Sequence, residues 1–256
     1  MTTDVVIVVP TVGRPSLRGL LRSLADEDPE LLERTIVVDD RRDPAAPLDV
    51  PAGIRVVRSG GHGPAAARNA GWRAADAAWI AFVDDDVLVT RGWAAALRAD
   101  LARAADDVAG SQGRIEVPLP ADRAPTDRER NVHGLEGAVW ATADMAYRRD
   151  ALLAVGGFDE RFPRAYREDV DLALRVMDAG WRLTRGTRRV VHPVRSAGPW
   201  ISVAQQAGNA DDALMRRLHG PRWRERARAR RGRLRWHVVA VAAAAGAAAA
   251  VAGRRP

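Results

Sequence analysis

Short apolar runs alternate with segments of helical spacing over the first 90 residues. Each run is continuous and rich in Val and Ile, which is typical of strands buried on both faces of a sheet. Residues 16–27 place apolar side chains at helical spacing behind Pro15, and residues 63–77 predict a second helix entered through the glycine-rich GGHGP. We predict strands at residues 4–10, 34–40, 54–59 and 79–86.

This order of strands and helices predicts an α/β fold with a Rossmann-like, mostly parallel sheet and helices on both faces. Residues 111–134 are rich in Pro and charge and lack periodicity, so we predict a long mobile loop there. Structure is expected to resume over 135–195, and 196–212 to be irregular or helical. We place a catalytic domain at 1–212 and an appended tail at 213–256.

Acidic residues close two of the predicted strands. Asp39 and Asp40 end one, and Asp84, Asp85 and Asp86 end another. Ligands of such sheets bind beyond the carboxyl ends of the strands, so these acids predict a single site. Adjacent carboxylates repel unless water or a cation compensates them, and Mg²⁺ or Mn²⁺ prefers oxygen ligands. Because alternate residues of an extended segment face the same way, Asp84 and Asp86 can face one metal. The alternative is a solvated acidic turn.

The segment GGHGPAAARN, residues 60–69, has two interpretations. Its backbone N–H groups can cradle phosphate at the helix start, or it is a loop and helix entry only. Arg68, on the helix, is placed to approach a diphosphate. The alternative for Arg68 is an exposed helical arginine.

The basic residues are all arginine, and they are unevenly distributed. Twelve of the 40 lie after residue 212 with one acid, so the tail carries a net charge of +11 whereas residues 1–212 carry −4. The net charge of +7 therefore belongs to an appendage and does not by itself indicate nucleic acid. Arginines and Trp236 beside the weakly apolar residues 238–253 favour an anionic membrane surface. A disordered extension is the first alternative, and spanning of the membrane is the second, because sixteen residues fall short of the roughly 20 needed to cross a bilayer.

Two further features limit the class of protein. The chain has no cysteine, which excludes disulfides, a thiolate zinc site and a cysteine nucleophile. The N-terminal MTTDVVIVVP lacks the pattern of a secretory signal. We therefore expect a cytoplasmic protein, peripheral at the cytoplasmic face of the membrane where the tail engages it.

Several ordered motifs together resemble the inverting family 2 glycosyltransferases of GT-A fold. They are PTVGRPSLRGLLRSL, IVVDD, GPAAARNAGW, IAFVDDDV, MAYRRDALLAVGGFDERF, REDVDLALRVMDAGWRL and a later VVHP, between about residues 4 and 195. The resemblance implies a GT-A type sheet and a nucleotide-sugar donor. It also implies a divalent cation, Mn²⁺ or Mg²⁺, and a glycan, lipid-linked or small-molecule acceptor.

On the donor side, the resemblance implies roles for the residues at strand ends. The acid closing the second strand recognises the nucleotide base in the family, which matches Asp40 with Asp39 beside it. The strand-end D-x-D matches Asp84 and Asp86, which would hold the metal and contact the donor ribose. We predict a donor-binding set of Pro10, Thr11, Asp39, Asp40, Arg68, Asp84 and Asp85, and a metal-binding set of Asp84, Asp86 and His192.

On the acceptor side, GGFDERF at 156–162 resembles the family loop beside the acceptor, and the ED of REDVDLALR resembles the catalytic pair. Asp169 matches the general base, while Glu168 orients the acceptor or shares that role. As alternatives, Glu168, Asp169 and Asp171 are first-turn acids favoured by the helix dipole, and His192 is structural.

The predicted function is metal-assisted, nonprocessive transfer of a single sugar with inversion. The Q-x-x-R-W motif of processive synthases is not present at QQAGN, residues 205–209. One alternative is a metal-dependent nucleotidyltransferase, for which PTVGRPS is a poor pyrophosphate loop. The other is a nucleic-acid-binding protein acting through the arginine tail, which would leave the acids of the body unexplained.

Overall fold

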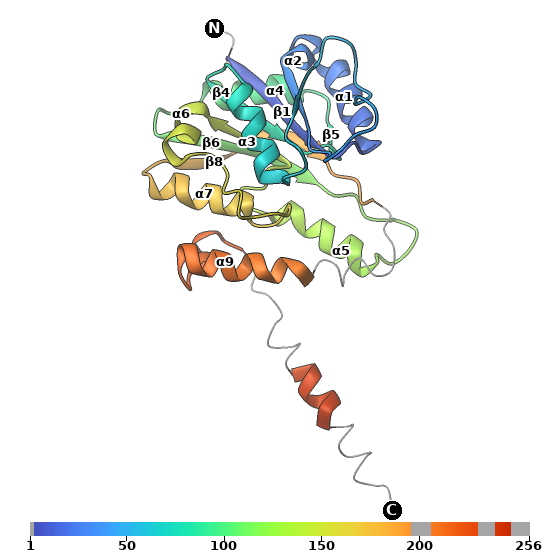
Figure 1. The fold of residues 1–256 in the computed structure, drawn as a ribbon, viewed down its shortest axis with the longest axis vertical. Coiled ribbons are helices and arrows are strands. Elements are labelled where there is room, and N and C mark those ends of the chain that lie inside the picture. Colours follow the sequence, from blue (N-terminus) through green and yellow to red (C-terminus); the bar gives the residue numbers. More distant parts are fainter. Residues whose placement is uncertain (1–2, 196–205, 230–238, 247–256) are drawn as a thin grey trace, which may run out of the picture.

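The computed structural model describes residues 3–195, 206–229 and 239–246 (Figure 1). Its first half contains β1 (Val5–Thr11), α1 (Ser16–Glu27), α2 (Pro29–Glu33), β2 (Thr35–Asp39), β3 (Arg55–Arg58), α3 (Pro64–Ala74), β4 (Trp79–Val83), β5 (Leu88–Val89) and α4 (Trp93–Ala102). There follow β6 (Val108–Glu116), α5 (Asp127–His133), η1 (Gly134–Gly137), β7 (Asp144–Arg148), α6 (Arg149–Val155), α7 (Glu168–Asp178), β8 (Arg182–Val191), η2 (Gln206–Gly208), α9 (Asn209–His219) and α10 (Trp223–Arg226). The strands and helices expected before residue 80 are all present, with small shifts at their ends.

The strands form one eight-stranded sheet in the order β3-β2-β1-β4-β7-β6-β8-β5. The four strands from β3 to β4 are parallel. β7 runs antiparallel to both β4 and β6, and β6 pairs in parallel with β8. The expected α/β class is confirmed. The sheet is mixed because β7, between β4 and β6, and β5, at the edge beside β8, run opposite to their neighbours.

Helices cover both faces of the sheet, and alternate residues of β1 divide the core between them. Val5, Ile7 and Val9 pack in one cluster with buried leucines of α1 and α4. Val6 and Val8 pack in a second cluster with side chains of α3, α6 and α7. This alternation follows from the side-chain period of two along a strand, and it explains why the strand sequence is apolar at every position.

Helix α3 lies very close to the sheet at Gly71. A Cβ atom at this position would lie 2.3 Å from Cγ1 of Val8 and 2.9 Å from Cγ2 of Val38. Because both valines are buried in the core, neither side chain has room to yield. The absence of a side chain at Gly71 therefore sets the depth of α3 against the sheet.

The prediction of a long loop over 111–134 is wrong at both ends. Residues 111–116 belong to β6, an internal strand whose polar Ser111 and Gln112 are almost fully buried. Helix α5 begins with a capping box in which Thr126 and Glu129 bond each other's backbone N–H groups. The apolar pattern of the sequence does not indicate β6, because this internal strand contains polar residues. The T-x-x-E sequence at 126–129, in contrast, is a recognisable signal for the start of α5.

Helix α9 lies alongside α7 (Figure 1), and the boundary expected at residue 212 falls within it. Met215, Trp223 and Ala227 share a small core with Phe162 and Leu174. Residues up to 229 thus pack on the body of the protein.

Parts of the expected tail can also be located. Residues 239–246 are helical. Residues 196–205, Trp236 and half of the apolar segment 238–253 lie outside the described residues. Within the described ranges, no helix has both the length and the apolar character needed to cross a bilayer.

Candidate active site

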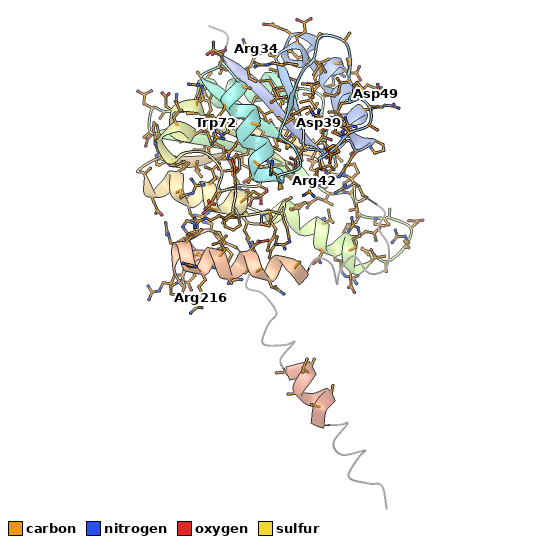
Figure 2. All side chains as sticks on the ribbon, in the orientation of Figure 1. Arg34, Asp39, Arg42, Asp49, Trp72 and Arg216 are labelled. Atoms are coloured by element: carbon orange, nitrogen blue, oxygen red, sulfur yellow. The ribbon has the colours of Figure 1, made fainter. Side chains whose placement is uncertain are left out.

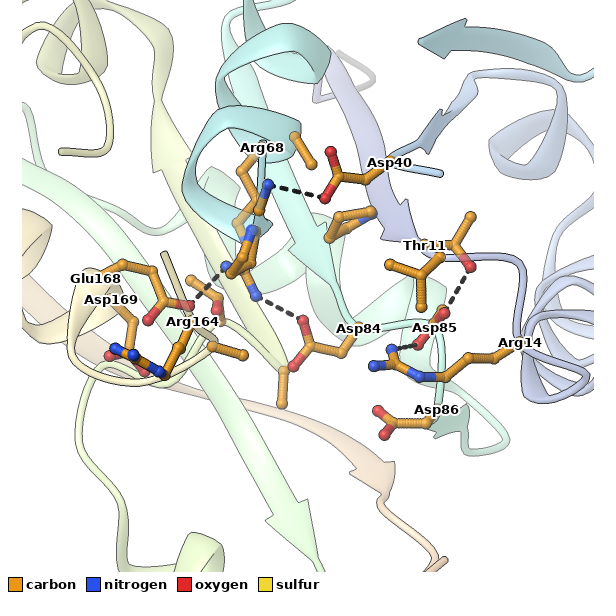
Figure 3. A pocket seen from close by; sticks show the side chains of 18 of the residues that line it. Thr11, Arg14, Asp40, Arg68, Asp84, Asp85, Asp86, Arg164, Glu168 and Asp169 are labelled. Carbon is orange, nitrogen blue, oxygen red and sulfur yellow. Dashed lines mark hydrogen bonds and ion pairs between the residues drawn. The ribbon is translucent and has the colours of Figure 1, made fainter. Parts of the chain in front are cut away.

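A cavity of about 450 Å³ opens at the carboxyl ends of β1 and β4 (Figure 3). The strand side contributes Pro10, Thr11 and the aspartates 84–86, and the start of α7 contributes Glu168 and Asp169. Ligands bind at this edge in sheets of parallel strands. The cavity therefore brings together two groups of carboxylates that lie more than 80 residues apart in the chain.

The three consecutive aspartates after β4 all line the cavity, but each has different partners. Asp84, the most exposed of them, accepts a 2.8 Å hydrogen bond from Arg68. Asp85 is 1% exposed and accepts hydrogen bonds from Thr11 Oγ1 at 2.6 Å and Arg14 Nη1 at 2.9 Å. Burial raises the pKa of Asp85, and these two donors oppose that shift. Asp85 is thereby tied to the end of β1, which leaves Asp84 and Asp86 for a ligand.

Asp86 and His192 form the part of the cavity that fits a divalent cation. Asp86 Oδ1 lies 3.4 Å from His192 Nε2, and its Oδ2 lies 3.0 Å from Arg195 Nη2. His192 Nδ1 is buried without a hydrogen-bond partner among the described residues. In the described ranges no three His, Asp or Glu side chains converge as a metal site. A cation here would therefore take most of its ligands from donor phosphates and water, as Mg²⁺ commonly does.

Arg68 lies between the two groups of carboxylates (Figure 3). Its Nη2 donates to Asp84 Oδ1 and its Nη1 donates to Glu168 Oε1, both at 2.8 Å. The arginine is 2% exposed. A buried guanidinium is stable only when acids compensate its charge, and here one acid comes from each wall of the cavity. The structure therefore supports neither an exposed helical arginine nor one free to bind diphosphate through both terminal nitrogens.

Glu168 and Asp169 occupy the first turn of α7, behind Arg167. Arg167 has a φ of 78°, a conformation that costs a residue other than glycine on the order of 1–3 kcal/mol and is concentrated at functional sites. Burial and the adjacent charge of Asp169 raise the pKa of Glu168 to about 8, and burial raises the pKa of Asp169 as well. Glu168 Oε2 has no hydrogen-bond partner within the described part of the chain. The pair therefore combines a proton-holding acid with a carboxylate at the cavity wall.

Asp40 organises the glycine-rich turn at the edge of the cavity. Its Oδ1 accepts from Ser59 Oγ at 2.7 Å and from the N–H groups of Gly61 and His62, both at 3.0 Å. Among the described residues its Oδ2 accepts only from the N–H of Gly63, at 3.0 Å. Asp40 therefore shapes the turn through Oδ1 and keeps acceptor capacity on Oδ2 for a ligand.

Asp39 does not line the cavity. Arg41 donates to both of its carboxylate oxygens, at 2.8 and 2.9 Å, and this hydrogen bonding holds the pKa of Asp39 below its usual range. The side chain lies beside a separate hollow lined by Leu48 and Arg58. The structure thus brings Asp40 to the site and leaves Asp39 outside it.

Three arginines that sequence reasoning did not single out also line the cavity: Arg14, Arg164 and Arg195. Each is partly exposed, with 40–44% of its side chain accessible, so each can contribute a positive charge to a ligand. Arginine is too frequent in this chain for its position alone to be informative. The signal in the sequence is that each lies within a few residues of a predicted site residue: Arg14 follows Thr11, Arg164 precedes Glu168 and Arg195 follows His192.

Solved structures define the class of the fold. GalNAc-T7 with UDP, GalNAc and Mn²⁺ has a TM-score of 0.61 at 18% identity, over 77% of this chain and 45% of that chain. Mannosyltransferase PcManGT from Pyrobaculum calidifontis, in complex with GDP-Man and Mn²⁺, has a TM-score of 0.56 at 18% identity, over 83% of this chain and 65% of that chain. The fold is therefore the GT-A fold of glycosyltransferases.

Residues 6–170 match the model of the family described as Glycosyl transferase family 2, and the chain belongs to this family. A pre-mycofactocin glycosyltransferase from two strains of Mycobacterium tuberculosis, CDC 1551 / Oshkosh and ATCC 25618 / H37Rv, is 33% identical over 202 residues. The match covers 70% of this chain and 40% of the relative, so the chain spans less than half of the relative's length. The resemblance expected from the ordered motifs is confirmed.

Proposed function

We propose that the chain catalyses nonprocessive transfer of one sugar, with inversion, from a nucleoside-diphosphate sugar to an acceptor hydroxyl. The observation that carries this proposal is a single cavity with two groups of carboxylates joined by Arg68. The strand-end group, Asp84 to Asp86, suits a diphosphate accompanied by a cation. The helix-start group, Glu168 and Asp169, suits removal of a proton.

In the proposed reaction, Asp169 accepts the proton of the acceptor hydroxyl while that oxygen bonds to the anomeric carbon. The bond from this carbon to the diphosphate breaks, and its electron pair leaves with the nucleoside diphosphate. Because attack and departure occur on opposite faces, the anomeric configuration inverts, and no protein nucleophile is required.

Glu168 complements the base in this scheme. Two adjacent carboxyl groups in a buried site do not both ionise readily, so the pair holds one proton near neutral pH. The raised pKa of Glu168, about 8, favours Glu168 as the holder of that proton; its Oε1 accepts from Arg68, and its Oε2 has no partner among the described residues. Because Oε2 is shielded from solvent, the side chain turns toward the cavity to donate a hydrogen bond to the acceptor while Asp169 remains the base.

On the donor side, Pro10, Thr11 and Asp40 line the part of the cavity assigned to the nucleoside. Arg14 and Arg195 supply fixed positive charge for the diphosphate as negative charge develops on it. A divalent cation held by Asp86 and His192, with Asp84 nearby, would add to that stabilisation.

We propose UDP- and GDP-sugars as the first donors to examine, because the two solved structures of this fold contain UDP or GDP-Man. The curated relative makes pre-mycofactocin one acceptor of interest. Glycan and lipid-linked hydroxyl acceptors form the rest of the panel.

We also propose peripheral binding to an anionic membrane surface. Arg216, Arg217, Arg222 and Arg228 are exposed on α9, α10 and their flanks, and Figure 2 shows Arg216 at the outer side of α9. Further arginines follow at residues 230–235 in the sequence. Each basic residue near an anionic leaflet adds on the order of 1 kcal/mol of attraction.

The deciding experiment supplies UDP- and GDP-sugars to the full-length protein with Mn²⁺ or Mg²⁺, with and without acceptors. We expect nucleoside diphosphate to be released in step with glycosylated product of inverted configuration. Addition of more than one sugar per acceptor, or retained configuration, would contradict the proposal. Release of pyrophosphate from a nucleoside triphosphate and a sugar phosphate would assign the chain to the nucleotidyltransferases instead.

A further inference from the structure

We infer that α9 positions the catalytic pair, with Asp212 as the main positioning residue. The ties between α9 and the start of α7 are here called the α9 clamp: Arg167–Asp212, Arg164–Asp211 and His219–Asp171. This inference rests on the proposed roles of Glu168 and Asp169. The family match ends at residue 170, so all of α9 lies beyond the matched stretch.

The central tie holds the residue that precedes the catalytic pair. Arg167 Nε donates to Asp212 Oδ1 at 2.8 Å, and both side chains are less than one-fifth exposed. The guanidinium also lies over the rings of Tyr166 and Trp223, with its Cζ 4.2 and 5.0 Å from their centroids. Asp212 Oδ2 pairs with Arg224 of α10. Arg167 is thus held by three side chains: Tyr166 beside it in the chain, Asp212 of α9 and Trp223 of α10.

Two further ties hold the residues on either side. Arg164, which lines the cavity, donates from Nη1 to Asp211 at 3.2 Å. In the first turn of α7, Asp171 is fully buried and its Oδ1 lies 2.7 Å from His219 Nε2. Its Oδ2 accepts from Arg175. The contacts of Asp171 therefore join α7 to the far end of α9.

The clamp has a direct consequence for the reaction centre. Arg167 adopts a left-handed backbone conformation, which persists only when its surroundings fix it. The main-chain carbonyl of Arg167 accepts from the N–H of Asp171, which is the first hydrogen bond of α7. The backbone conformation of Arg167 therefore determines the position of the first turn of α7, which carries Glu168 and Asp169. Without Asp212, the Arg167 side chain loses the only carboxylate to which it donates a hydrogen bond among the described residues, and its charge is no longer held away from Asp169.

The test compares Asp212→Ala with Asp178→Ala in the full-length protein. Asp178 pairs with Arg226 of α10 at the opposite end of α7, so its loss removes a helix–helix ion pair that is remote from the cavity. We expect Asp212→Ala to lower kcat about 10- to 100-fold, since small misplacement of a catalytic group has effects of this size. The KM for donor and the calorimetric Kd for UDP or GDP with Mn²⁺ should stay unchanged. Asp178→Ala should keep the wild-type kcat.

A rescue variant distinguishes a positioning role of Asp212 from a merely structural one. Asp212→Glu restores the carboxylate and should recover most of kcat, whereas a merely destabilising loss would be shared by Asp178→Ala. Unchanged kcat in Asp212→Ala, or equal losses in both alanine variants, would overturn the inference. If Asp212→Ala does not fold, Asp212→Asn, which keeps one acceptor, should show a smaller loss of the same kind.

The clamp can fail independently of the proposed function. If the wild-type protein transfers no sugar from any donor, the proposed function fails, and amide hydrogen exchange still tests the clamp. We then expect faster exchange over residues 163–171 in Asp212→Ala, or in Asp212→Asn if needed, than in Asp178→Ala. Equal rates of amide hydrogen exchange in the compared variants would contradict the inference that the α9 clamp holds this segment.

Discussion

Arg68 and Glu168, a hundred residues apart in the chain, form a 2.8 Å hydrogen bond in which each side chain is 3% exposed. The other terminal nitrogen of Arg68 holds Asp84. One guanidinium therefore connects the strand side of the cavity to the start of α7.

Replacing Arg68 with Met should destabilise the protein strongly. The change removes the hydrogen bonds from Arg68 to Asp84 and Glu168. It also leaves the buried Oε1 of Glu168 without a donor, and each buried polar group left unsatisfied typically costs about 1–3 kcal/mol. Denaturant unfolding measures the change in the free energy of unfolding. Arg18→Met is a suitable control, because Arg18 and Asp49 form a pair in which both side chains are about 70% exposed. The control should change stability little, and equally small effects in both variants would show that the bridge has no stabilising role.

The turnover should show a bell-shaped dependence on pH. Below a pKa of about 8, Glu168 holds its proton and can donate to the acceptor; as pH rises through that value the proton is lost and turnover falls. At low pH the base Asp169 becomes protonated, and burial moves this limb above the ordinary range of an aspartate. Glu168→Gln keeps a neutral donor, so it should retain substantial turnover and lose the alkaline limb. If the alkaline limb persists in this variant, another group causes it.

Asp169→Asn should fold and bind donor but fail in transfer. An amide does not accept the hydroxyl proton, and loss of a general base typically costs roughly 10²–10⁴-fold in rate. Asp150→Asn is the matched control, since Asp150 is a first-turn acid of α6 outside the cavity. It should lose only a small helix-dipole contribution and keep its kcat. Near-normal turnover of Asp169→Asn would transfer the base to Glu168 or discard the inverting scheme.

Asp86→Ala should abolish metal-dependent donor binding. Asp86 faces His192, and its carboxylate is the main oxygen ligand that this end of the cavity offers. Calorimetric titration with UDP or GDP, in Mn²⁺ and in EDTA, measures the effect. Asp76→Ala, at an exposed position after α3, should titrate like wild type. Identical affinity of the wild-type protein with and without metal would show that no cation takes part in donor binding.

Truncation after residue 229 should separate membrane binding from catalysis. It removes six of the twelve arginines that follow residue 212 and keeps α9 and α10 on the body. Sedimentation with phosphatidylserine vesicles should fall, and the remaining binding should weaken as salt rises. Truncation after residue 212 should instead destabilise the protein, because Met215 and Trp223 are fully buried. Equal sedimentation of the full-length and 229-residue proteins at low salt would contradict the proposed surface.

The sequence is most informative where one physical signal decides the structure. β1 and β4 are apolar at consecutive positions because both faces are covered, so their runs could be located, and the acids that follow could be placed at one edge. β6 could not, because its buried Ser111 and Gln112 are satisfied by partners elsewhere in the chain. Gln112, for example, donates to Ala138.

The same limit explains the outcome for the site residues. The sequence places Asp39 and Asp40 at the same strand end, yet consecutive residues of an extended segment face opposite ways, and Asp40 lines the cavity whereas Asp39 does not. The pairing of Arg68 with both walls requires the fold, since its partners are 16 and 100 residues away. The role of residues 213–229 was hidden by their basic composition, which described an appendage and gave no sign of the buried Trp223.

The close packing of α3 at Gly71 also determines where the Arg68 side chain begins. Gly71 lies one turn further along α3, where the helix rests directly on Val8 and Val38 with no side chain between. The Arg68 side chain has a limited length, so it reaches both Asp84 and Glu168 only when α3 lies at this distance from the sheet. Gly71→Ala would push α3 away from the sheet. The Arg68 guanidinium would then move away from both Asp84 and Glu168, although the new methyl group contacts neither acid. The position of Arg68 thus depends partly on a side chain that is absent at residue 71, where Val8 and Val38 fill the space instead.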